Sequence, residues 1–440
     1  MPDRNTLEDW LDYISGLHPK DMDLGLTRVA TVAARLDVSS PAPCVVTVAG
    51  TNGKGSTTAV LETLLSDAGL KTGATFSPHV SRFNERIRIS GRDADDAEIC
   101  DAFRAIDAAR GDIALTYFEY AALAALHLFR QAEVDVALLE IGLGGRLDAF
   151  NLVDADVAVV TSIGLDHQDY LGSDLEGIGR EKAGIFRAGR PVVLGTVTES
   201  VHQAAAELNC PSYRLDHEFR VERTADRWSY LSEAAGHSQP LADVSLHDLP
   251  VGALAPANCA LALTAARLAL QQLGAHADPG RFTAGLAGIC LPGRMEAHQY
   301  RGVGVLLDVA HNPAAARFLA GELKHRWPQR RYVAIYGALA DKDAPGVMAE
   351  LEDLLQHRLL VPTSGWRAQS AEALSEQIGA AQQAEICRSL TDALDRARSL
   401  TEPGNGILVF GSFSAVEQAR ELLIDPTTSA ASVTKVTGSD

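Results

Sequence analysis

Residues 44–57, CVVTVAGTNGKGST, decide the fold of the N-terminal part of this chain. Residues 44–49 are apolar and rich in β-branched side chains, which predicts a short buried strand. A glycine-rich turn covers residues 50–55, and residues 56–68 predict a helix. Such a turn at the start of a helix directs backbone N–H groups and the positive end of the helix dipole towards an anion. The segment therefore predicts a phosphate-binding loop, in which Lys54 reaches the outer phosphates.

The loop departs from the commonest phosphate-loop pattern, GxxxxGK[ST]. Val48 stands at the first glycine of that pattern, and Gly55 follows Lys54 where a hydroxyl residue is usual. An ordinary glycine turn is the alternative interpretation. The strand before the loop and the helix after it favour nucleotide binding, because both lie where a phosphate site needs them.

Strands and helices alternate along most of the chain, which predicts an α/β protein. Around the loop we expect strands at 86–89, 134–141, 156–163 and 191–194, and helices at 117–130, 176–187 and 252–273. A second series has strands at 303–309, 332–336, 359–361 and 407–410, with helices at 314–326, 345–355, 371–381, 390–400 and 414–423. Both series predict mostly parallel sheets with helices on both faces, and the second is a smaller doubly wound unit.

The turn at residues 291–294, LPGR, is the predicted domain boundary. It divides the chain into an N-terminal domain, 1–293, and a C-terminal domain, 294–425. The less regular stretch 212–250 predicts a small β insertion. The tail 426–440 is rich in Ser and Thr and is predicted to be disordered.

Composition limits the possible partners and compartments. The formal net charge of −18 argues against nucleic acid or an anionic membrane as the main partner. The apolar runs are shorter than the roughly 20 residues that cross a bilayer, and the acidic N-terminus is unlike a secretory signal. Six scattered cysteines without a CxxC pair predict buried, reduced thiols. We therefore expect a cytoplasmic protein, and a monomer by default.

Two polar side chains follow predicted strands. Glu140 ends the strand at 134–141, and His167 lies just past the strand at 156–163. Carboxyl ends of parallel strands face the ligand crevice, so we expect these strand ends to be neighbours and the two side chains to share one metal ion. Structural roles remain the alternative for each residue taken alone.

The motif GTNGKGS at residues 50–56 resembles the phosphate loop of the Mur ligase superfamily. Its GKGS ending resembles the folate branch, the dihydrofolate synthase and folylpolyglutamate synthase family. The resemblance extends over nearly the whole chain, including FSPHVSRFNERIRI at 76–89 and DVAHNP at 308–313. It implies a P-loop-containing, Mur-ligase-like N-terminal domain and a smaller Rossmann-like C-terminal glutamate-ligase domain.

The resemblance also implies a metal site and a modified lysine. Ser77, Glu140 and His167 match the family's Mg²⁺ ligands. The magnesium assignment of His167 rests on the resemblance, since hard cations prefer oxygen ligands. Lys182, in GREKAGIF, matches a lysine that is carbamylated in the family, and the reaction with CO₂ needs a neutral amine. Lys54, Lys182 and His167 are the expected catalytic residues.

Further positions are assigned to the substrates by the same resemblance. The expected ATP site comprises Thr51, Asn52, Gly53, Lys54, Gly55, Ser56, Asn258, Arg294 and Asp308. The expected pterin or folate site comprises Asp23, Leu24, Gly25, Leu26, Thr116, Tyr117, Phe118, Glu119, Leu147, Asp148 and Ala149. The expected glutamate site comprises His311 and Ser412. A helix cap, a surface arginine, a strand-end aspartate and core packing of the aromatic rings remain the alternatives.

The activity that the resemblance implies is ligation of L-glutamate to dihydropteroate and to reduced folates, with ATP as co-substrate and Mg²⁺ as cofactor. An acyl phosphate would be the intermediate, and ADP and phosphate the products. The alternatives are a folylpolyglutamate synthase alone, another Mur-type amino-acid ligase, or a P-loop ATPase or nucleotide sensor without ligase activity.

Overall fold

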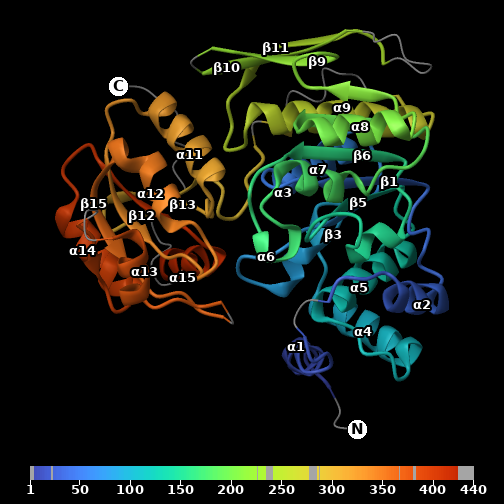
Figure 1. Cartoon of the computed structure of the whole chain (residues 1–440), viewed down its shortest axis with the longest axis horizontal. Coiled ribbons are helices and arrows are strands. Elements are labelled where there is room, and N and C mark those ends of the chain that lie inside the picture. Colours follow the sequence, from blue (N-terminus) through green and yellow to red (C-terminus); the bar gives the residue numbers. More distant parts are fainter. Residues whose placement is uncertain are drawn as a thin grey trace. The chain divides into compact units, whose positions relative to one another are not determined.

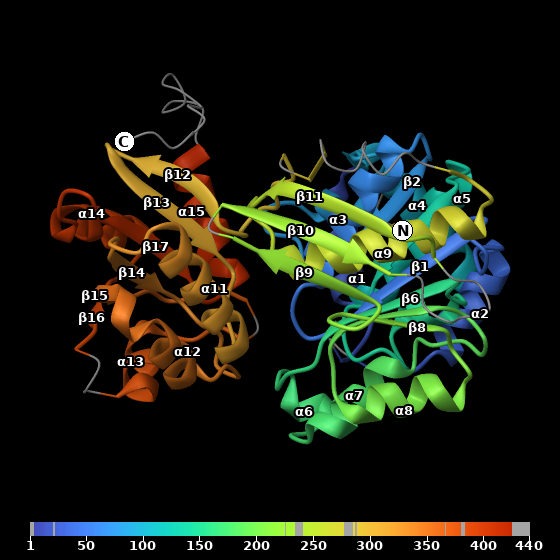
Figure 2. The same cartoon turned by 90° about the horizontal axis from the view of Figure 1, so that it is seen from above.

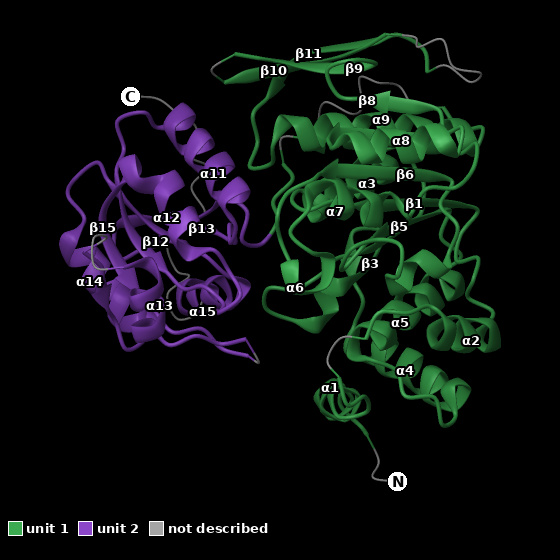
Figure 3. Cartoon of the chain, viewed as in Figure 1, with its two compact units in different colours: residues 1–291 green, residues 292–440 purple. Residues whose placement is uncertain are grey.

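The structure is a computed structural model that describes residues 4–20, 23–224, 226–233, 241–276, 285–286, 288–365, 367–379 and 383–424. The chain forms two compact units, which divide between Leu291 and Pro292 (Figure 3). The predicted disordered tail at 426–440 lies outside the described residues.

Unit 1 contains an eight-stranded sheet in the order β4-β3-β2-β5-β1-β6-β7-β8 (Figure 1). In the part of this order from β2 to β8, all neighbouring strands are parallel, and only the pairs β2–β3 and β3–β4 at one edge are antiparallel. The predicted mostly parallel sheet is therefore confirmed. The strands are β1 (Cys44–Ala49), β2 (Thr72–Thr75), β3 (Ile87–Ile89), β4 (Arg92–Asp93), β5 (Val136–Glu140), β6 (Val157–Ser162), β7 (Val192–Thr196) and β8 (Ser212–Arg214).

Helices cover both faces of this sheet and enclose two cores. Val45 of β1 belongs to the core that contains Trp10 and Phe103, whereas Val46 belongs to the core that contains Leu61. This alternation follows from the two-residue period of a strand. The first core is formed with α1 (Leu7–Ser15), α2 (Thr27–Leu36), α4 (Asp96–Arg110), α5 (Tyr117–Gln131), α7 (Leu175–Ala183) and α8 (Glu199–Glu207), and the second with α3 (Lys54–Asp67) and α9 (Pro256–Gln272).

A three-stranded antiparallel sheet lies over α9, as Figure 2 shows from above. It consists of β9 (Phe219–Arg223), β10 (Arg227–Ser232) and β11 (Val244–Pro250). The Tyr230 hydroxyl on β10 is hydrogen-bonded to Thr264 on α9 at 2.9 Å. Arg267, also on α9, donates to the same hydroxyl at 3.1 Å. The predicted β insertion is confirmed, and these polar contacts attach it to the second core.

Unit 2 is a smaller α/β unit with a six-stranded sheet in the order β12-β13-β17-β14-β15-β16. All pairs are parallel except β12 with β13. Its strands are β12 (Glu296–Tyr300), β13 (Val303–Asp308), β14 (Tyr332–Tyr336), β15 (Leu355–Leu360), β16 (Glu385–Ile386) and β17 (Gly406–Phe410). Its helices are α11 (Pro313–Arg326), α12 (Ala344–Leu351), α13 (Ala371–Ile378), α14 (Leu390–Leu400) and α15 (Phe413–Ile424). Among the described residues, no helix combines the length and hydropathy that crossing a membrane requires.

A substitution at Gly73 would test how tightly the first core packs on the sheet. A Cβ at Gly73 on β2 would lie 2.5 Å from the ring of Phe129 on α5. We expect Gly73→Ala to lower the free energy of unfolding by about 1–3 kcal/mol, because overpacking forces a buried ring to move. Urea denaturation followed by circular dichroism would measure the change.

Gly16→Ala in the same unit is the matched control. Gly16 ends α1 with a φ of −94°, and a Cβ there would meet only Tyr13 O at 3.7 Å. Equal denaturation midpoints for the two variants would contradict the expected packing.

Candidate active site

The predicted phosphate loop joins β1 to α3 and is held against β6. Thr51 N–H donates to Ser162 O at 2.7 Å, and Thr161 Oγ1 donates to Asn52 O at 2.7 Å. A Cβ at Gly50, which has a φ of 147°, would lie 1.9 Å from Thr161 Oγ1. The close approach of loop and strand therefore requires glycine at residue 50.

Asn258 lies against the phosphate loop. It belongs to the first turn of α9, and a Cβ at Gly53 would be 2.6 Å from its Oδ1. Gly53 has a φ of 89° and immediately precedes Lys54, the first residue of α3. The structure thus brings Asn258 next to predicted loop residues although the two are distant in sequence.

Lys54 and Lys182 share one backbone acceptor. Lys54 Nζ donates to Gly50 O at 3.1 Å and to Thr51 O at 3.3 Å. Lys182 Nζ, which comes from α7 and is buried, donates to Gly50 O at 2.9 Å. Burial and the positive charge of Lys54 lower the pKa of Lys182 to about 7, although Asp166 and Asp148 act in the opposite direction. Near neutral pH, a large fraction of the Lys182 amine is therefore unprotonated.

Glu140 and Ser77 meet beside the loop. Glu140 is the last residue of β5, and its side chain is buried. Its Oε2 accepts the Ser77 N–H at 2.9 Å. A Cβ at Gly55 would lie 3.6 Å from both carboxylate oxygens of Glu140, so the carboxylate adjoins the first turn of α3.

His167 follows a strand that is not adjacent to the strand of Glu140. It lies beyond β6, directly before α6 (Gln168–Leu171), with a left-handed φ of 50°. The prediction that the ends of β5 and β6 are neighbours was wrong, because β1 lies between them. The phosphate loop consequently separates the strands that lead to Glu140 and to His167.

Within the described ranges, no group of three or more His, Cys, Asp or Glu side chains lies close enough together to hold a metal ion. The set predicted from sequence contains only two residues of these types, Glu140 and His167, together with Ser77. Oxygen ligands from phosphate or water would have to complete the coordination of a bound cation.

Two of the three segments predicted to bind the pterin meet through Arg28, which was not predicted from the sequence. Arg28 Nε donates to Glu119 Oε2 at 2.9 Å, and Arg28 also forms an ion pair with Asp23. Glu119 in turn accepts the Thr116 N–H at 2.8 Å, so Thr116 and Glu119 cap the start of α5. Arg28 thus joins residues 23–26 to residues 116–119. The available signal was a lone arginine directly after DLGLT.

Phe118 lies between this segment and the loop after Glu140. A Cβ at Gly142 would lie 2.5 Å from the Phe118 ring, and this ring packs edge-on against Phe150 at 5.7 Å between centroids. Phe118 is only partly buried, and its neighbour Tyr117 is also half-buried. The first turn of α5 therefore presents aromatic surface close to Glu140.

Asp148 organises the turn that follows Glu140. Its buried carboxylate accepts N–H groups from Gly142, Leu143 and Phe150 at 2.9–3.0 Å. Burial raises its pKa to about 6, against the effect of these hydrogen bonds. Among its predicted neighbours, Ala149 is buried and Leu147 is partly exposed. The carboxylate of Asp148 shapes the turn, and Leu147 is the more accessible side chain of the three.

The predicted residues of unit 2 gather at the ends of β13 and β17. Asp308 is buried and accepts the Met295 and Ala310 N–H groups at 3.0 and 2.9 Å. The Phe413 ring adjoins both Arg294, whose guanidinium carbon is 5.5 Å from its centre, and the His311 ring at 6.4 Å. Ser412 Oγ, which precedes α15, accepts the Ala415 N–H at 3.1 Å. Phe413 is the member of this group that the sequence analysis did not identify.

A substitution at Gly53 would test whether the loop binds phosphate. We expect Gly53→Ala to weaken ADP binding at least about tenfold, roughly 1.4 kcal/mol, because the added Cβ would meet Asn258 in a left-handed conformation. Isothermal titration calorimetry would measure this affinity. Gly69→Ala is the control, since Gly69 has a φ of 88° and nothing within 4 Å of its Cβ position. Unchanged ADP affinity in Gly53→Ala would contradict this role for the loop.

Both units match models of known protein families. Residues 48–239 match the Mur ligase middle domain, and residues 293–413 match the Mur ligase glutamate ligase domain. The dihydrofolate synthase/folylpolyglutamate synthase of Escherichia coli strain K12 is 42% identical over 419 residues, which cover 95% of each chain.

Solved structures agree with this similarity. The structure of E. coli FolC in complex with DHPP and ADP has a TM-score of 0.88 and 41% identity, covering 98% of this chain and 100% of that one. The Yersinia pestis bifunctional folylpolyglutamate synthase/dihydrofolate synthase, complexed with AMPPNP and Mn ion, has a TM-score of 0.86 and 40% identity, covering 96% and 99%. This chain therefore belongs to the Mur ligase superfamily and, within it, to the dihydrofolate synthase/folylpolyglutamate synthase family.

Proposed function

We propose that this protein uses ATP to ligate L-glutamate to dihydropteroate and to reduced folates, with release of ADP and phosphate. The observation that carries the proposal is the convergence of Lys54, Lys182 and Glu140 on the loop after β1. Family membership supports it, because relatives that match nearly the whole chain bear both activities in their names. The chain is an ATP-dependent carbon–nitrogen ligase.

The loop is assigned to the phosphates of ATP. Residues 51–53 lead into α3, residues 54–56 begin this helix, and Asn258 lies against the loop. Lys54 offsets the negative charge that accumulates on the transferred phosphoryl group. From unit 2, we assign Arg294 and Asp308 to ATP, and His311 and Ser412 to the incoming glutamate.

We assign a Mg²⁺ ion to Ser77, Glu140 and His167. The Glu140 carboxylate fits this role, since it adjoins both the Ser77 backbone and the start of α3. When bound, Mg²⁺ would neutralise phosphate charge. The Mn ion bound with AMPPNP in the Yersinia pestis relative supports a divalent cation in this family.

The acceptor is assigned to the aromatic start of α5 and its surroundings. Phe118 offers a ring for stacking. Arg28 links residues 23–26 to Glu119 in residues 116–119, and the Phe118 ring packs against Phe150, which directly follows residues 147–149. The dihydrofolate synthase activity in the names of the relatives supports a pteroate acceptor. A carboxylate oxygen of the acceptor attacks the γ-phosphorus of ATP and displaces ADP. The glutamate amine then attacks the acyl carbon of the resulting acyl phosphate and expels phosphate.

We further propose that the ligase acts as a cytoplasmic monomer. Its substrates are small anions, which local lysine and arginine side chains bind despite the net charge of −18. Neither nucleic acid nor a membrane takes part in the proposed reaction.

ADP release tests the activity directly. Purified protein receives Mg²⁺, ATP and L-glutamate, with dihydropteroate in one tube and a reduced folate in another. We expect ADP only where glutamate and an acceptor are both present, and in both tubes. Release in one tube alone would reduce the function to a single activity, and AMP in place of ADP would contradict the acyl-phosphate route. ADP formation without glutamate would indicate an ATPase.

Lys182 is proposed to react with CO₂ as its neutral amine. A pKa near 7 means that lowering the pH below 7 protonates the amine and opposes carbamate formation, whereas raising it favours the carbamate. We expect a protein-bound carbamate signal in ¹³C NMR with ¹³C-bicarbonate, which fades as pH falls through about 7. Lys182→Gln should lack the signal, and Lys71→Gln, at an exposed lysine, should keep it. The same signal in Lys182→Gln would refute the assignment.

A further inference from the structure

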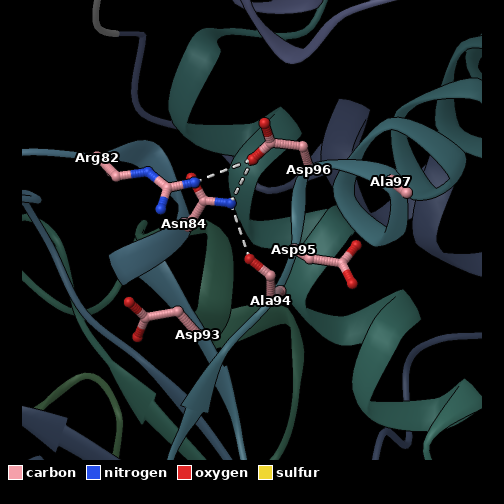
Figure 4. Close-up of a pocket in the computed structure, with 7 residues that line it drawn as sticks. All are labelled: Arg82, Asn84, Asp93, Ala94, Asp95, Asp96 and Ala97. Atoms are coloured by element: carbon pink, nitrogen blue, oxygen red, sulfur yellow. Dashed lines mark hydrogen bonds and ion pairs between the residues drawn. The ribbon is translucent and has the colours of Figure 1, made fainter.

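Three arginines in the segment RFNERIR, residues 82–88, have different surroundings. Arg82 is 68% exposed and pairs with Asp96 at 3.2 Å, beside an open hollow of about 430 Å³ (Figure 4). Arg88 pairs with the buried Glu62 at 3.3 Å and donates to Gly91 O at 2.8 Å. Both arginines therefore have oxygen partners within unit 1.

Arg86 differs because the only hydrogen-bond partner of its side chain among the described residues is an imidazole. Its Nε donates to His79 Nδ1 at 2.7 Å, which requires that nitrogen of His79 to be unprotonated. The adjacent Glu85 instead accepts the N–H groups of residues 80–82. Within the described ranges, the two terminal nitrogens of Arg86 thus have neither a hydrogen bond nor an ion pair.

The surroundings of Arg86 hold this edge of the guanidinium in place. The side chain is only partly exposed, and its guanidinium carbon lies 5.6 Å from the Tyr117 ring centre and 5.8 Å from that of Phe83. These rings and His79 hold the guanidinium in place. A fixed, partly desolvated guanidinium offers two parallel N–H groups, which match the two oxygens of a carboxylate.

The sheet topology places Arg86 on the acceptor side of the site. Arg86 immediately precedes β3, Ser77 follows β2, Glu140 ends β5 and the phosphate loop follows β1, and these strands are neighbours in that order. Because β3 runs antiparallel to β2, its beginning lies at the same edge as the ends of the other three strands. At roughly 4.8 Å per strand, the loop is about 14 Å away from Arg86. Tyr117, which contacts Arg86, is next to Phe118 on the first turn of α5.

We propose that Arg86 binds a carboxylate of the pteroate or pteroylglutamate acceptor, and that His79 orients the guanidinium for this contact. The proposal rests on the acceptor class assigned above. Its site lies between the aromatic start of α5 and Glu140, where the carboxylate end of an acceptor must lie for phosphoryl transfer. Neither Arg86 nor His79 was assigned to a substrate by the sequence analysis.

The test compares Arg86→Gln, Arg86→Lys and the control Arg82→Gln with the unmodified protein. Steady-state kinetics are measured with dihydropteroate and with tetrahydropteroylglutamate, and acceptor binding is measured separately by calorimetry. We expect Arg86→Gln to weaken acceptor binding and to lower kcat/KM for the acceptor about 10- to 100-fold, the loss expected for one charge-assisted pair. Arg86→Lys should recover part of this loss, and Arg82→Gln should match the unmodified protein.

Two further readouts separate substrate binding from a structural role. ADP affinity and the thermal midpoint should be unchanged in Arg86→Gln, because the guanidinium's hydrogen bond is to His79, and Glu140 and Glu85 act on it only as neighbouring charges. Weaker binding of both acceptors by Arg86→Gln would identify the reacting carboxylate as the partner of Arg86. Weaker binding of the glutamylated acceptor alone would identify the α-carboxylate of its glutamate tail as the partner.

Three outcomes would overturn the proposal or its basis. Unchanged kcat/KM and acceptor binding in Arg86→Gln would remove Arg86 from the acceptor site. A matching fall in ADP affinity or thermal midpoint would make its role structural. Failure of the unmodified protein to release ADP or bind either acceptor would instead refute the proposed function itself.

Discussion

The shared backbone acceptor at Gly50 is the constraint on which the rest of the site depends. Its carbonyl accepts hydrogen bonds from both Lys54 and Lys182, and its missing side chain lets Thr161 approach closely. Two like charges on one oxygen repel each other, and this repulsion adds to the effect of burial on Lys182. The loop can maintain the arrangement because β6 holds it through Thr161 and Ser162. A side chain at residue 50 would push the phosphate loop away from β6, and Lys54 and Lys182 would lose their shared acceptor.

The strand order then determines which side chains lie on each side of the phosphate loop. Because β1 lies between β5 and β6, groups that follow these two strands flank the phosphate loop. Glu140 is on the side of β5 and β2, which is also the side of α5, Phe118 and Arg86. On the proposed assignment, the acceptor approaches from this side of the phosphates, with Phe118 at its aromatic end and Arg86 at a carboxylate.

Local patterns predicted the secondary structure well where a single period dominates. Cys44–Ala49, Tyr332–Tyr336 and Leu390–Leu400 have the expected bounds, because a buried strand or an amphipathic helix is encoded within its own residues. Helices α1, α2 and α4 were not predicted, although Thr6 and Asp95 are clear capping residues for two of them. The predicted adjacency of β5 and β6 was wrong, because sequence proximity does not reveal that β1 is inserted between them. Arg28 and Glu119 are 91 positions apart, and Lys182 and Gly50 are 132 apart, so no local pattern could pair them.

The hydrogen bond between Lys182 and Gly50 also limits what carbamylation can do. As an ammonium, Lys182 donates to the Gly50 carbonyl and adds positive charge beside Lys54. As a carbamate, it carries two acceptor oxygens, and these repel a carbonyl oxygen at the same distance. The modified side chain must therefore turn away from Gly50 and towards a cation, and Lys54 is the cation already beside it. The reaction with CO₂ would replace a repulsive lysine pair by an attractive one, and Lys54 would then be positioned by Gly50, Thr51 and the carbamate together.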